Sequence, residues 1–463
     1  MASMQSEIFL MIQIALLLFG VEFIRARAKL LSTAGIIWAG IGLAVMTDGL
    51  DGNLSFPLRI FGALLLLESL ITLSVAASGM GAQRGVLYFK GGICLFVATL
   101  ILSKKIYSDL LLAIFFGGTY FVMGVLVITC ACLVRYQHWR SSLISGGGQI
   151  IFALVLLIPY PTDYKATVLF FLGSLMIVGG LNTICISRRA RQLRDGASAF
   201  ELLAPGDLLS DLLNAPSMEP RQSEYNNGEP LIVHIWTPEG ASSNAPVPRP
   251  IFNRYIAAVD TEGIISTGHA ALELAPGLYI SLYPASDIDR SPSEFLGLLR
   301  ATRDNDVPGK FLTDYATEAA DWCDSDRRIV FYEYNATALK RFWTSYRQRS
   351  IYNLTYRNCS SSVAYALEAS MDGVLSNRGR HWNSTLRTLF MPELWIAAHI
   401  RKRALTMAWT PGLLMDYARA IRAIVHPVPV SWVRRLPWRG LSAGKLLGMA
   451  VKLNGSDDEN RQL

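Results

Sequence analysis

Residues 352–367 read YNLTYRNCSSSVAYAL, and this stretch decides the fold of the second half of the chain. An extended run ends at Asn358, and the residues from Cys359 onward are typical of a helix. Val363 and Leu367 share the face of Cys359, and a lone cysteine on an apolar face usually belongs to a core. A thiol in the first turn of a helix also meets unpaired N–H groups and the positive end of the helix dipole, which favour the thiolate. Cys359 is therefore either a core residue or a nucleophile.

A histidine that could serve as a base lies upstream, in the stretch GHAALELAPGLYISLYP at residues 268–284. This stretch alternates as two strands around a Pro-Gly turn, with His269 at the start of the first strand. His269 is either a strand residue with a satisfied ring or the partner of a nucleophile. In the second case, histidine on a strand precedes cysteine on a helix, which is the reverse of the order in papain.

With this order, GHAALEL and RNCSSSVAYAL resemble the circularly permuted papain-like thiol enzymes, a group that includes lecithin retinol acyltransferase-like and permuted NlpC-type proteins. The resemblance covers about residues 230–375 and implies an α+β domain with an antiparallel sheet. It implies that Cys359 is the nucleophile and His269 the general base. The family places a polar residue on the second strand to orient the histidine, and that position holds Ser281. A serine stabilises an imidazolium poorly, so three neighbours are alternatives: Glu273, Tyr279 and Tyr283.

Other candidate groups have weaker chemistry. Cys323 lies among acidic residues, which raise a thiol pKa, so it is a poor nucleophile. His234 in LIVHIWTP is expected to pack on the same sheet rather than to react. The chain has no phosphate-binding glycine loop and no spacing typical of metal ligands, so we expect neither a cofactor nor a metal. The six cysteines show no disulfide pattern.

The first part of the chain is a membrane domain by composition. Half of all residues are hydrophobic and 17% are charged, and almost all long apolar runs fall before residue 188. The N-terminus lacks the features of a cleaved signal, so the first run is expected to stay. Length predicts about seven spans, with a six-span or re-entrant variant open, at residues 8–24, 33–50, 58–78, 86–103, 109–134, 142–159 and 166–187.

The last six spans look like three copies of a helical hairpin, each with a glycine-rich first arm, preceded by an extra N-terminal span. This pattern, over about residues 30–187, resembles the HdeD-like family of small bacterial membrane proteins, which is associated with acid stress and has no established chemistry. Glu68 and Lys90 lie inside two spans and are expected to pair or to reach the interface.

Arginine and lysine are in excess on one side of the spans, which predicts that the C-terminal part is cytoplasmic. The HdeD-like resemblance implies that the membrane is a bacterial inner membrane. That part divides into a basic juxtamembrane linker, a papain-like domain, basic amphipathic helices and a disordered tail: residues 188–228, 229–391, 392–452 and 453–463. The basic helices, with Trp395 and Trp409 beside Arg401 and Arg419, suit either anionic lipid headgroups or packing on the enzyme domain. Nucleic acid is not an expected partner.

The sequence thus predicts a membrane-anchored cysteine hydrolase or acyltransferase that forms an acyl-enzyme on Cys359 with His269 as base. It would cleave an amide, ester or thioester, with a lipid or a membrane-associated peptide as substrate. The alternative is a non-enzymatic HdeD-like stress-response protein whose papain-like domain is degenerate and only binds.

Overall fold

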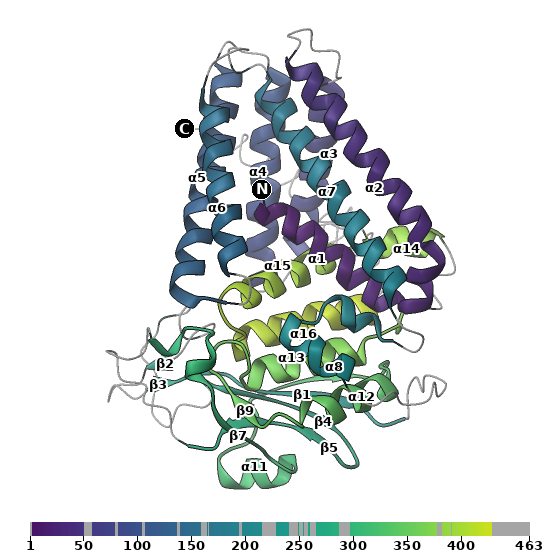
Figure 1. Ribbon diagram of the computed structural model, residues 1–463, viewed down its shortest axis with the longest axis vertical. Helices are drawn as coiled ribbons and strands as arrows, with labels where there is room; N and C mark the ends of the chain where they lie inside the picture. The colour runs from purple at the N-terminus through teal and green to yellow at the C-terminus, as the bar shows by residue number, and fades with distance from the viewer. Residues whose placement is uncertain are drawn as a thin grey trace, which may run out of the picture.

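The computed structural model places long helices at one end of the molecule and a mixed body of helices and small sheets at the other (Figure 1). It describes residues 2–50, 58–78, 82–103, 107–136, 139–158, 164, 166–193, 197–214, 228–239, 249, 253, 258–259, 265–286, 297–376, 382–389 and 391–427. The expected tail, the second half of the expected basic region and part of the expected linker lie outside these residues.

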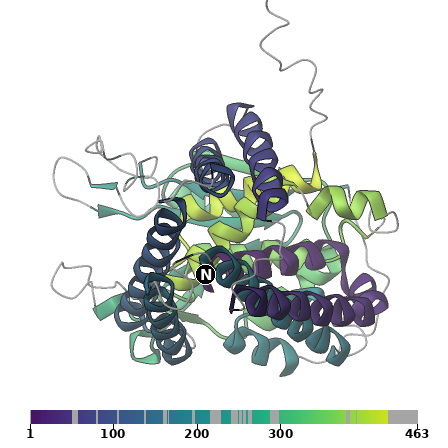
Figure 2. The same ribbon diagram turned by 90° about the horizontal axis from the view of Figure 1, so that it is seen from above.

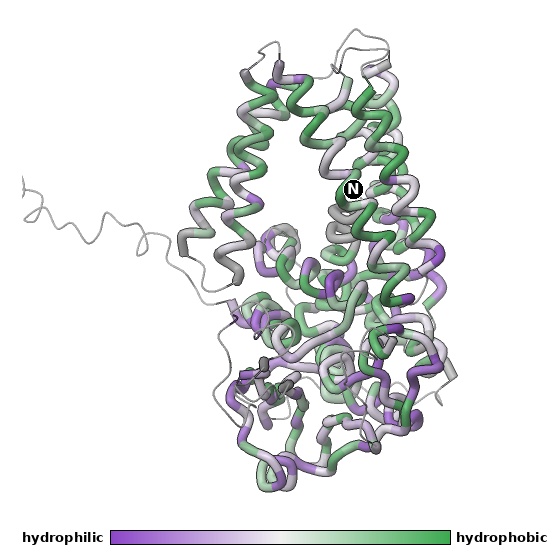
Figure 3. Tube along the Cα trace, turned by 90° about the vertical axis from the view of Figure 1, so that its left-hand side faces the viewer, coloured by the Kyte–Doolittle hydropathy of each residue, from purple (hydrophilic) through white to green (hydrophobic). Residues whose placement is uncertain are grey.

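The first half of the chain is helical and apolar. Its long helices are α2 (Val21–Leu50), α3 (Leu58–Ser78), α4 (Ala82–Ser103), α5 (Ser108–Val134), α6 (Trp139–Leu157) and α7 (Thr167–Gln192). Among the described residues, four of them, α2, α5, α6 and α7, are long and apolar enough to cross a membrane. Their apolar residues colour this end green in Figure 3, and side chains such as Ile36 and Ile144 are exposed. The chain is therefore a multi-pass membrane protein, which is the coarser part of the seven-span prediction.

The long helices pair as α2 with α7, α3 with α4 and α5 with α6, and the three pairs form separate groups when seen from above (Figure 2). In two of these pairs, glycines that face each other allow the two backbones to approach closely. A Cβ on Gly35 would lie 2.8 Å from the carbonyl oxygen of Gly180, and one on Gly124 would lie 2.8 Å from that of Gly146. The predicted hairpins paired residues 33–50 with 58–78, 86–103 with 109–134 and 142–159 with 166–187. This pairing is wrong. Close backbone approach at glycines selects the partner, whether or not it is next in sequence.

Glu68 and Lys90 form an ion pair between α3 and α4, with Nζ of Lys90 2.6 Å from Oε1 of Glu68. Pairing was one of the two outcomes expected for them. The Lys90 ammonium also lies 5.3 Å from the ring centre of Trp395. Trp395 belongs to α15 (Pro392–Thr406), so this pair joins the membrane helices to the C-terminal body.

Helix α1 (Ala2–Phe19) differs from the expected first span. Its residues from Leu10 onward join the large core of the C-terminal body, where Ile14 and Leu18 are fully buried. The chain turns at Gly20 (φ +85°), where a Cβ would lie 2.8 Å from Cα of Gly373. The backbone N–H of Gly373 donates to the carbonyl of Leu17 at 2.9 Å. The apolar run of α1 is therefore buried in protein over this part.

Within the described residues, the C-terminal body contains three small antiparallel sheets. The largest has the order β5-β4-β1-β8 and consists of β1 (Leu231–Trp236), β4 (His269–Leu274), β5 (Leu278–Ile280) and β8 (Arg327–Phe331). A second sheet has the order β6-β7-β9: β6 (Leu282–Pro284), β7 (Val307–Phe311) and β9 (Ile351–Tyr352). A third pairs β2 (Ala258–Val259) with β3 (Ile265–Ser266). The antiparallel sheet of the predicted α+β domain is present; these elements alone do not define a permuted papain-like fold.

The largest sheet has helices on both faces (Figure 1). Val233 and Leu272, which are paired in register, point into the core shared with α12 (Ala336–Tyr346), α13 (Cys359–Ser370) and α16 (Pro411–Val425). Trp236 and Ala271 point to the opposite face, toward Tyr315 of α11 (Tyr315–Asp321). Strand alternation thus separates an apolar face near the membrane helices from a face rich in polar and aromatic residues.

The basic helices pack on the domain, which is one of the two outcomes expected for them. Arg401 of α15 is 1% exposed, and its Nε lies 2.6 Å from Oε1 of Glu368 on α13. Trp409 is also buried. The segment expected as a linker contains a 3-10 turn, η1 (Ala199–Leu202), and a helix, α8 (Gly206–Asn214), and Phe200 is buried in the core.

Candidate active site

Cys359 is the first residue of α13, and its position is fixed by a capping box. The Asn358 side chain accepts a hydrogen bond from the N–H of Ser361 at 2.8 Å, and the Ser361 hydroxyl accepts one from the N–H of Asn358 at 2.8 Å. The Asn358 amide also donates to the carbonyls of Leu354 and Trp409. This cap leaves the half-buried Cys359 in the first turn, where the helix dipole favours a thiolate.

His269 begins β4 and is buried. The residue before it, Gly268, has a φ of +67°, and a Cβ there would lie 2.4 Å from the carbonyl oxygen of Trp236. Only glycine fits this turn. The turn directs His269 toward the first residue of α13, Cys359, and the two side chains lie close enough to shift each other's pKa. The structure thus brings together the two residues that the sequence singled out.

The far nitrogen of the His269 ring has two polar neighbours. Its Nε2 lies 2.8 Å from Oγ of Ser281 and 3.2 Å from Oε1 of Glu318. Ser281 was expected here from its place after the turn, between β5 and β6. Glu318, on α11, was not expected. The imidazole is therefore held at one nitrogen by a hydroxyl and a carboxylate, while Cys359 interacts with the ring as well.

Glu318 is 1% exposed and is held by two tyrosines. Tyr283 donates to Oε1 at 2.7 Å, and Tyr279 donates to Oε2. The Tyr283 ring also stacks on the His269 ring, with centres 4.1 Å apart. Tyr283 and Tyr279 therefore contribute as supports of Glu318 and of the ring plane. The sequence signal for Glu318 was an acid at helical spacing between two aromatic residues, Tyr315 and Trp322.

The charges of this cluster favour a thiolate beside an imidazolium. Burial lowers the pKa of His269, but the charge of Cys359 and the hydrogen bonds to Cys359 and Glu318 outweigh burial and raise that pKa to about 9. Burial raises the pKa of Cys359, but the His269 charge and the hydrogen bonds from His269, Ser360 and Ala270 lower it overall. Burial also raises the pKa of Glu318, yet its bonds to His269 and the tyrosines bring it down to about 2. Glu318 is thus ionised and favours a protonated ring.

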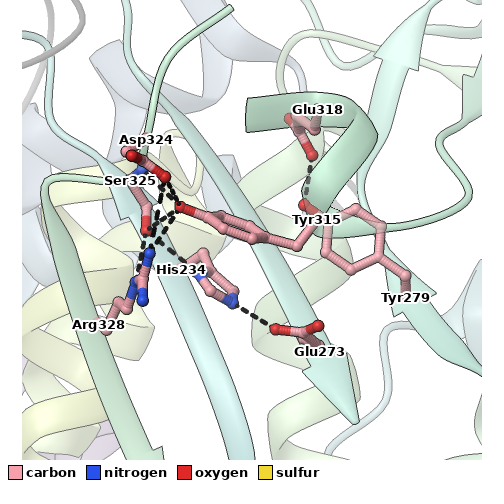
Figure 4. A network of polar contacts seen from close by, with 8 residues as sticks. All are labelled: His234, Glu273, Tyr279, Tyr315, Glu318, Asp324, Ser325 and Arg328. Carbon is pink, nitrogen blue, oxygen red and sulfur yellow. Dashed lines mark hydrogen bonds and ion pairs between the residues drawn. The ribbon is translucent and has the colours of Figure 1, made fainter. Parts of the chain in front are cut away.

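Glu273, an alternative third residue, lies elsewhere on the same sheet face. Its Oε2 is 2.9 Å from Nε2 of His234, and Nδ1 of His234 is 3.0 Å from Oγ of Ser325 (Figure 4). Tyr315 stacks on His234 with ring centres 4.1 Å apart. Burial lowers the pKa of His234. Glu273 therefore serves His234, in a second histidine–carboxylate cluster.

Aromatic rings form a wall beside His269. Trp236 lies 5.5 Å from the His269 ring centre and stacks on Trp322, whose own ring is 44% exposed. The Trp236 indole N–H donates to the carbonyl of Cys323 at 2.8 Å. Burial and the charges of Asp326 and Asp324 raise the pKa of Cys323. An exposed apolar edge thus lies next to the cluster, and Cys323 nearby is a thiol of ordinary or lower reactivity.

Among the described residues, no group of three or more histidine, cysteine or acidic side chains is placed to hold a metal ion. Comparison of the chain with protein-family models, with curated proteins and with solved structures finds no match. The geometry around Cys359 and His269 is therefore what bears on function.

Proposed function

We propose that the protein is a membrane-anchored cysteine hydrolase or acyltransferase, with Cys359 as nucleophile, His269 as acid and base, and Glu318 with Ser281 as the groups that orient His269. The observation that carries the proposal is the line of contacts from the first residue of a helix through an imidazole to a buried carboxylate. A nucleophile, a base and an orienting group within hydrogen-bond reach are the signature of covalent acyl chemistry. Bacterial inner-membrane localisation, a cytoplasmic active site and a papain-like domain are parts of the same proposal.

In this mechanism the thiolate of Cys359 attacks a carbonyl carbon, and the carbonyl π electrons move to the oxygen. N–H groups at the start of α13 stabilise the developing oxyanion. The intermediate collapses, the bond to the leaving group breaks, and His269 gives its proton to that group. The remaining thioester is released when His269 takes a proton from water or from an acceptor alcohol or amine, whose oxygen or nitrogen attacks the acyl carbon.

Glu318 answers the main objection to an enzyme, which was that Ser281 alone would stabilise an imidazolium poorly. A buried carboxylate beside Nε2 supplies the missing charge. The position of α11 on the face away from the membrane helices keeps this support independent of the membrane domain (Figure 1). The bond cleaved is an ester, thioester or amide of a lipid or of a membrane-associated peptide.

The test is acylation of the full-length protein in detergent with a short-chain aryl ester, followed by peptide mass analysis. We expect a hydroxylamine-labile acyl group on Cys359 that is absent from Cys359→Ala and from His269→Ala. Cys323→Ala is the matched control and should acylate like the wild type. Acylation of Cys323 as fast as Cys359, or labelling of Cys359 that does not depend on His269, would rule the proposal out.

A further inference from the structure

A second feature lies on the membrane side of the C-terminal body. It is a pocket of about 740 Å³ between the ends of α5 and α6 and the body. Arg135 and Trp139 come from the α5–α6 end, and the other walls come from residues 203–208, 301–306, 346–357 and 404–409 and from Tyr365. The N–H of Ala301 donates to the carbonyl of Val134 at 2.7 Å. This hydrogen bond joins the C-terminal body to the end of α5 beside the pocket.

The pocket is strongly basic. Four arginines line it, at positions 135, 303, 349 and 357, against one carboxylate, Asp306. Asp306 accepts hydrogen bonds from Tyr356 at 2.7 Å and from Asn353 at 2.9 Å, so it is already engaged. Arg357 is buried and donates to the carbonyls of Tyr346 and Arg349, each at 2.7 Å, which fixes its charge in the wall. The net positive charge suits a phosphate-bearing ligand.

Trp409 lines the pocket with its ring and is 2% exposed. Its Nε1 is buried, and the Tyr365 hydroxyl is the acceptor that lies near it. The ring therefore adds an apolar wall, and the arginines supply the polar groups that a ligand would meet.

The position of the pocket identifies the source of the anion. α5 and α6 are both long enough to cross a membrane, and the pocket lies where α5 ends and α6 begins. Trp139, with Arg135 5.8 Å from its ring centre, is the kind of residue that lies at headgroup level. A site at the end of two spans is therefore level with lipid phosphates rather than open only to water.

We propose that this pocket binds the phosphate headgroup of an anionic phospholipid and so docks the C-terminal body on the bilayer. Binding of anionic headgroups was one of the two outcomes expected for the basic helices, but Arg401 of α15 and Trp409, between α15 and α16, are buried. The site does not depend on the chemistry proposed for Cys359, because no residue of that cluster lines the pocket. Both sites are nevertheless linked through Asn358, which donates to the carbonyl of Trp409 at 2.9 Å.

The experiment uses the full-length protein in nanodiscs of phosphatidylcholine with or without phosphatidylglycerol, and native mass spectrometry after release. We expect the wild type to retain phosphatidylglycerol in preference to phosphatidylcholine. Arg303→Ala combined with Arg349→Ala should retain about tenfold less, because each interfacial arginine contributes to headgroup binding. Arg300→Ala combined with Arg347→Ala removes equal charge from exposed neighbours outside the pocket and should retain as much as the wild type.

Equal losses in both double variants would mean general surface attraction and would overturn the proposal. Glycerol 3-phosphate in phosphatidylcholine nanodiscs is the second arm, and binding of this soluble ester as strong as that of the lipid would overturn the lipid assignment. If the arginine double variant does not fold, as judged by thermal unfolding, the single variant Arg303→Ala, at an exposed position that lines the pocket, replaces it. Unchanged retention of phosphatidylglycerol in that variant would contradict the proposal.

Discussion

Two histidine clusters lie on one face of the largest sheet, and they differ in what the second ring nitrogen meets. His234 has Ser325 on Nδ1 and Glu273 on Nε2, so both nitrogens are saturated. His269 has its hydroxyl and its carboxylate on the same nitrogen, Nε2, and interacts with the thiol of Cys359. The same residue types on neighbouring strands thus make one closed cluster and one that couples to a nucleophile.

The electrostatic outcome follows this difference. Burial lowers the pKa of both rings, and for His234 burial prevails. For His269 the negative charges of Cys359 and Glu318 prevail, and the pKa rises to about 9. A carboxylate partner alone therefore does not make a buried histidine basic in this protein. The added thiolate does, and it turns the cluster into an ion pair.

The largest difference is expected between replacement of His269 and replacement of His234. His269→Gln should abolish the rapid reaction of Cys359 with iodoacetamide, because it removes the charge that stabilises the thiolate. His234→Gln is the matched variant and should leave that reaction within about twofold, since His234 makes its hydrogen bonds to Glu273 and Ser325 and not to Cys359. Labelling rates are measured by peptide mass analysis on folded protein. Equal slowing by the two variants would mean that Cys359 depends on general folding only.

The pH dependence of labelling should distinguish Cys323 from Cys359, the two thiols of the C-terminal body. An ordinary thiol becomes about 100-fold more reactive between about pH 6 and about pH 8. Cys323, whose pKa is raised, should follow that slope, whereas the rate for Cys359, whose pKa is lowered, should rise less steeply. Acyl transfer, which also needs protonated His269, should fall above about pH 9. Parallel slopes for the two thiols would contradict the ion pair.

An intermediate difference is expected between replacement of Glu318 and replacement of Glu273. Glu318→Gln should lower the rate of acylation about tenfold, the equivalent of one unit of His269 pKa. Glu273→Gln should leave the rate unchanged.

Because the folded-state pKa of Glu318 is lowered to about 2, its stabilising effect is present above its unfolded pKa and is lost as pH falls toward 2. Thermal unfolding should therefore show that Glu318→Gln destabilises at neutral pH more than at acidic pH. A stability loss of equal size at neutral and acidic pH would show that Glu318 does not stabilise the protein through an ion pair with His269.

The smallest effect is expected for the two serines. Ser281→Ala removes one hydrogen bond from His269 while Glu318 remains, and it should slow acylation about threefold. Ser325→Ala removes the corresponding bond from His234 and should not change acylation. Steady-state kinetics with the aryl ester would check both. A loss far beyond threefold in Ser281→Ala would make Ser281, not Glu318, the main orienting residue.

Much of the site could be predicted from local sequence. Asn358 before Cys359 is an N-cap signal, and the Gly-His start of a hairpin placed His269 on β4 and Ser281 directly after the adjacent strand β5. Glu318 could not be placed in this way, since it comes from α11, between β7 and β8, and its contact with His269 spans 49 residues. The residues predicted for the third position all lie in the hairpin, where Glu273 is the acid. The register of β1 with β4 directs Glu273 to His234.

The membrane half gives the same lesson with a different interaction. Hydropathy identified the apolar runs because lipid requires about 20 apolar residues for each span. It could not say that α2 pairs with α7, since facing glycines such as Gly35 and Gly180, 145 positions apart in the sequence, meet only in three dimensions. It also could not say that α1 is buried in the C-terminal core.

The sequence by itself determined the short-range features: apolar runs, the cap at Asn358, the glycine turn before His269 and the hairpin that follows it. These depend on backbone preferences and on hydrogen bonds between residues a few positions apart. Only the tertiary structure decided which carboxylate faces which histidine, which helices pair, and that four arginines gather at the ends of α5 and α6. Those outcomes depend on packing between distant segments, where burial and charge are settled together.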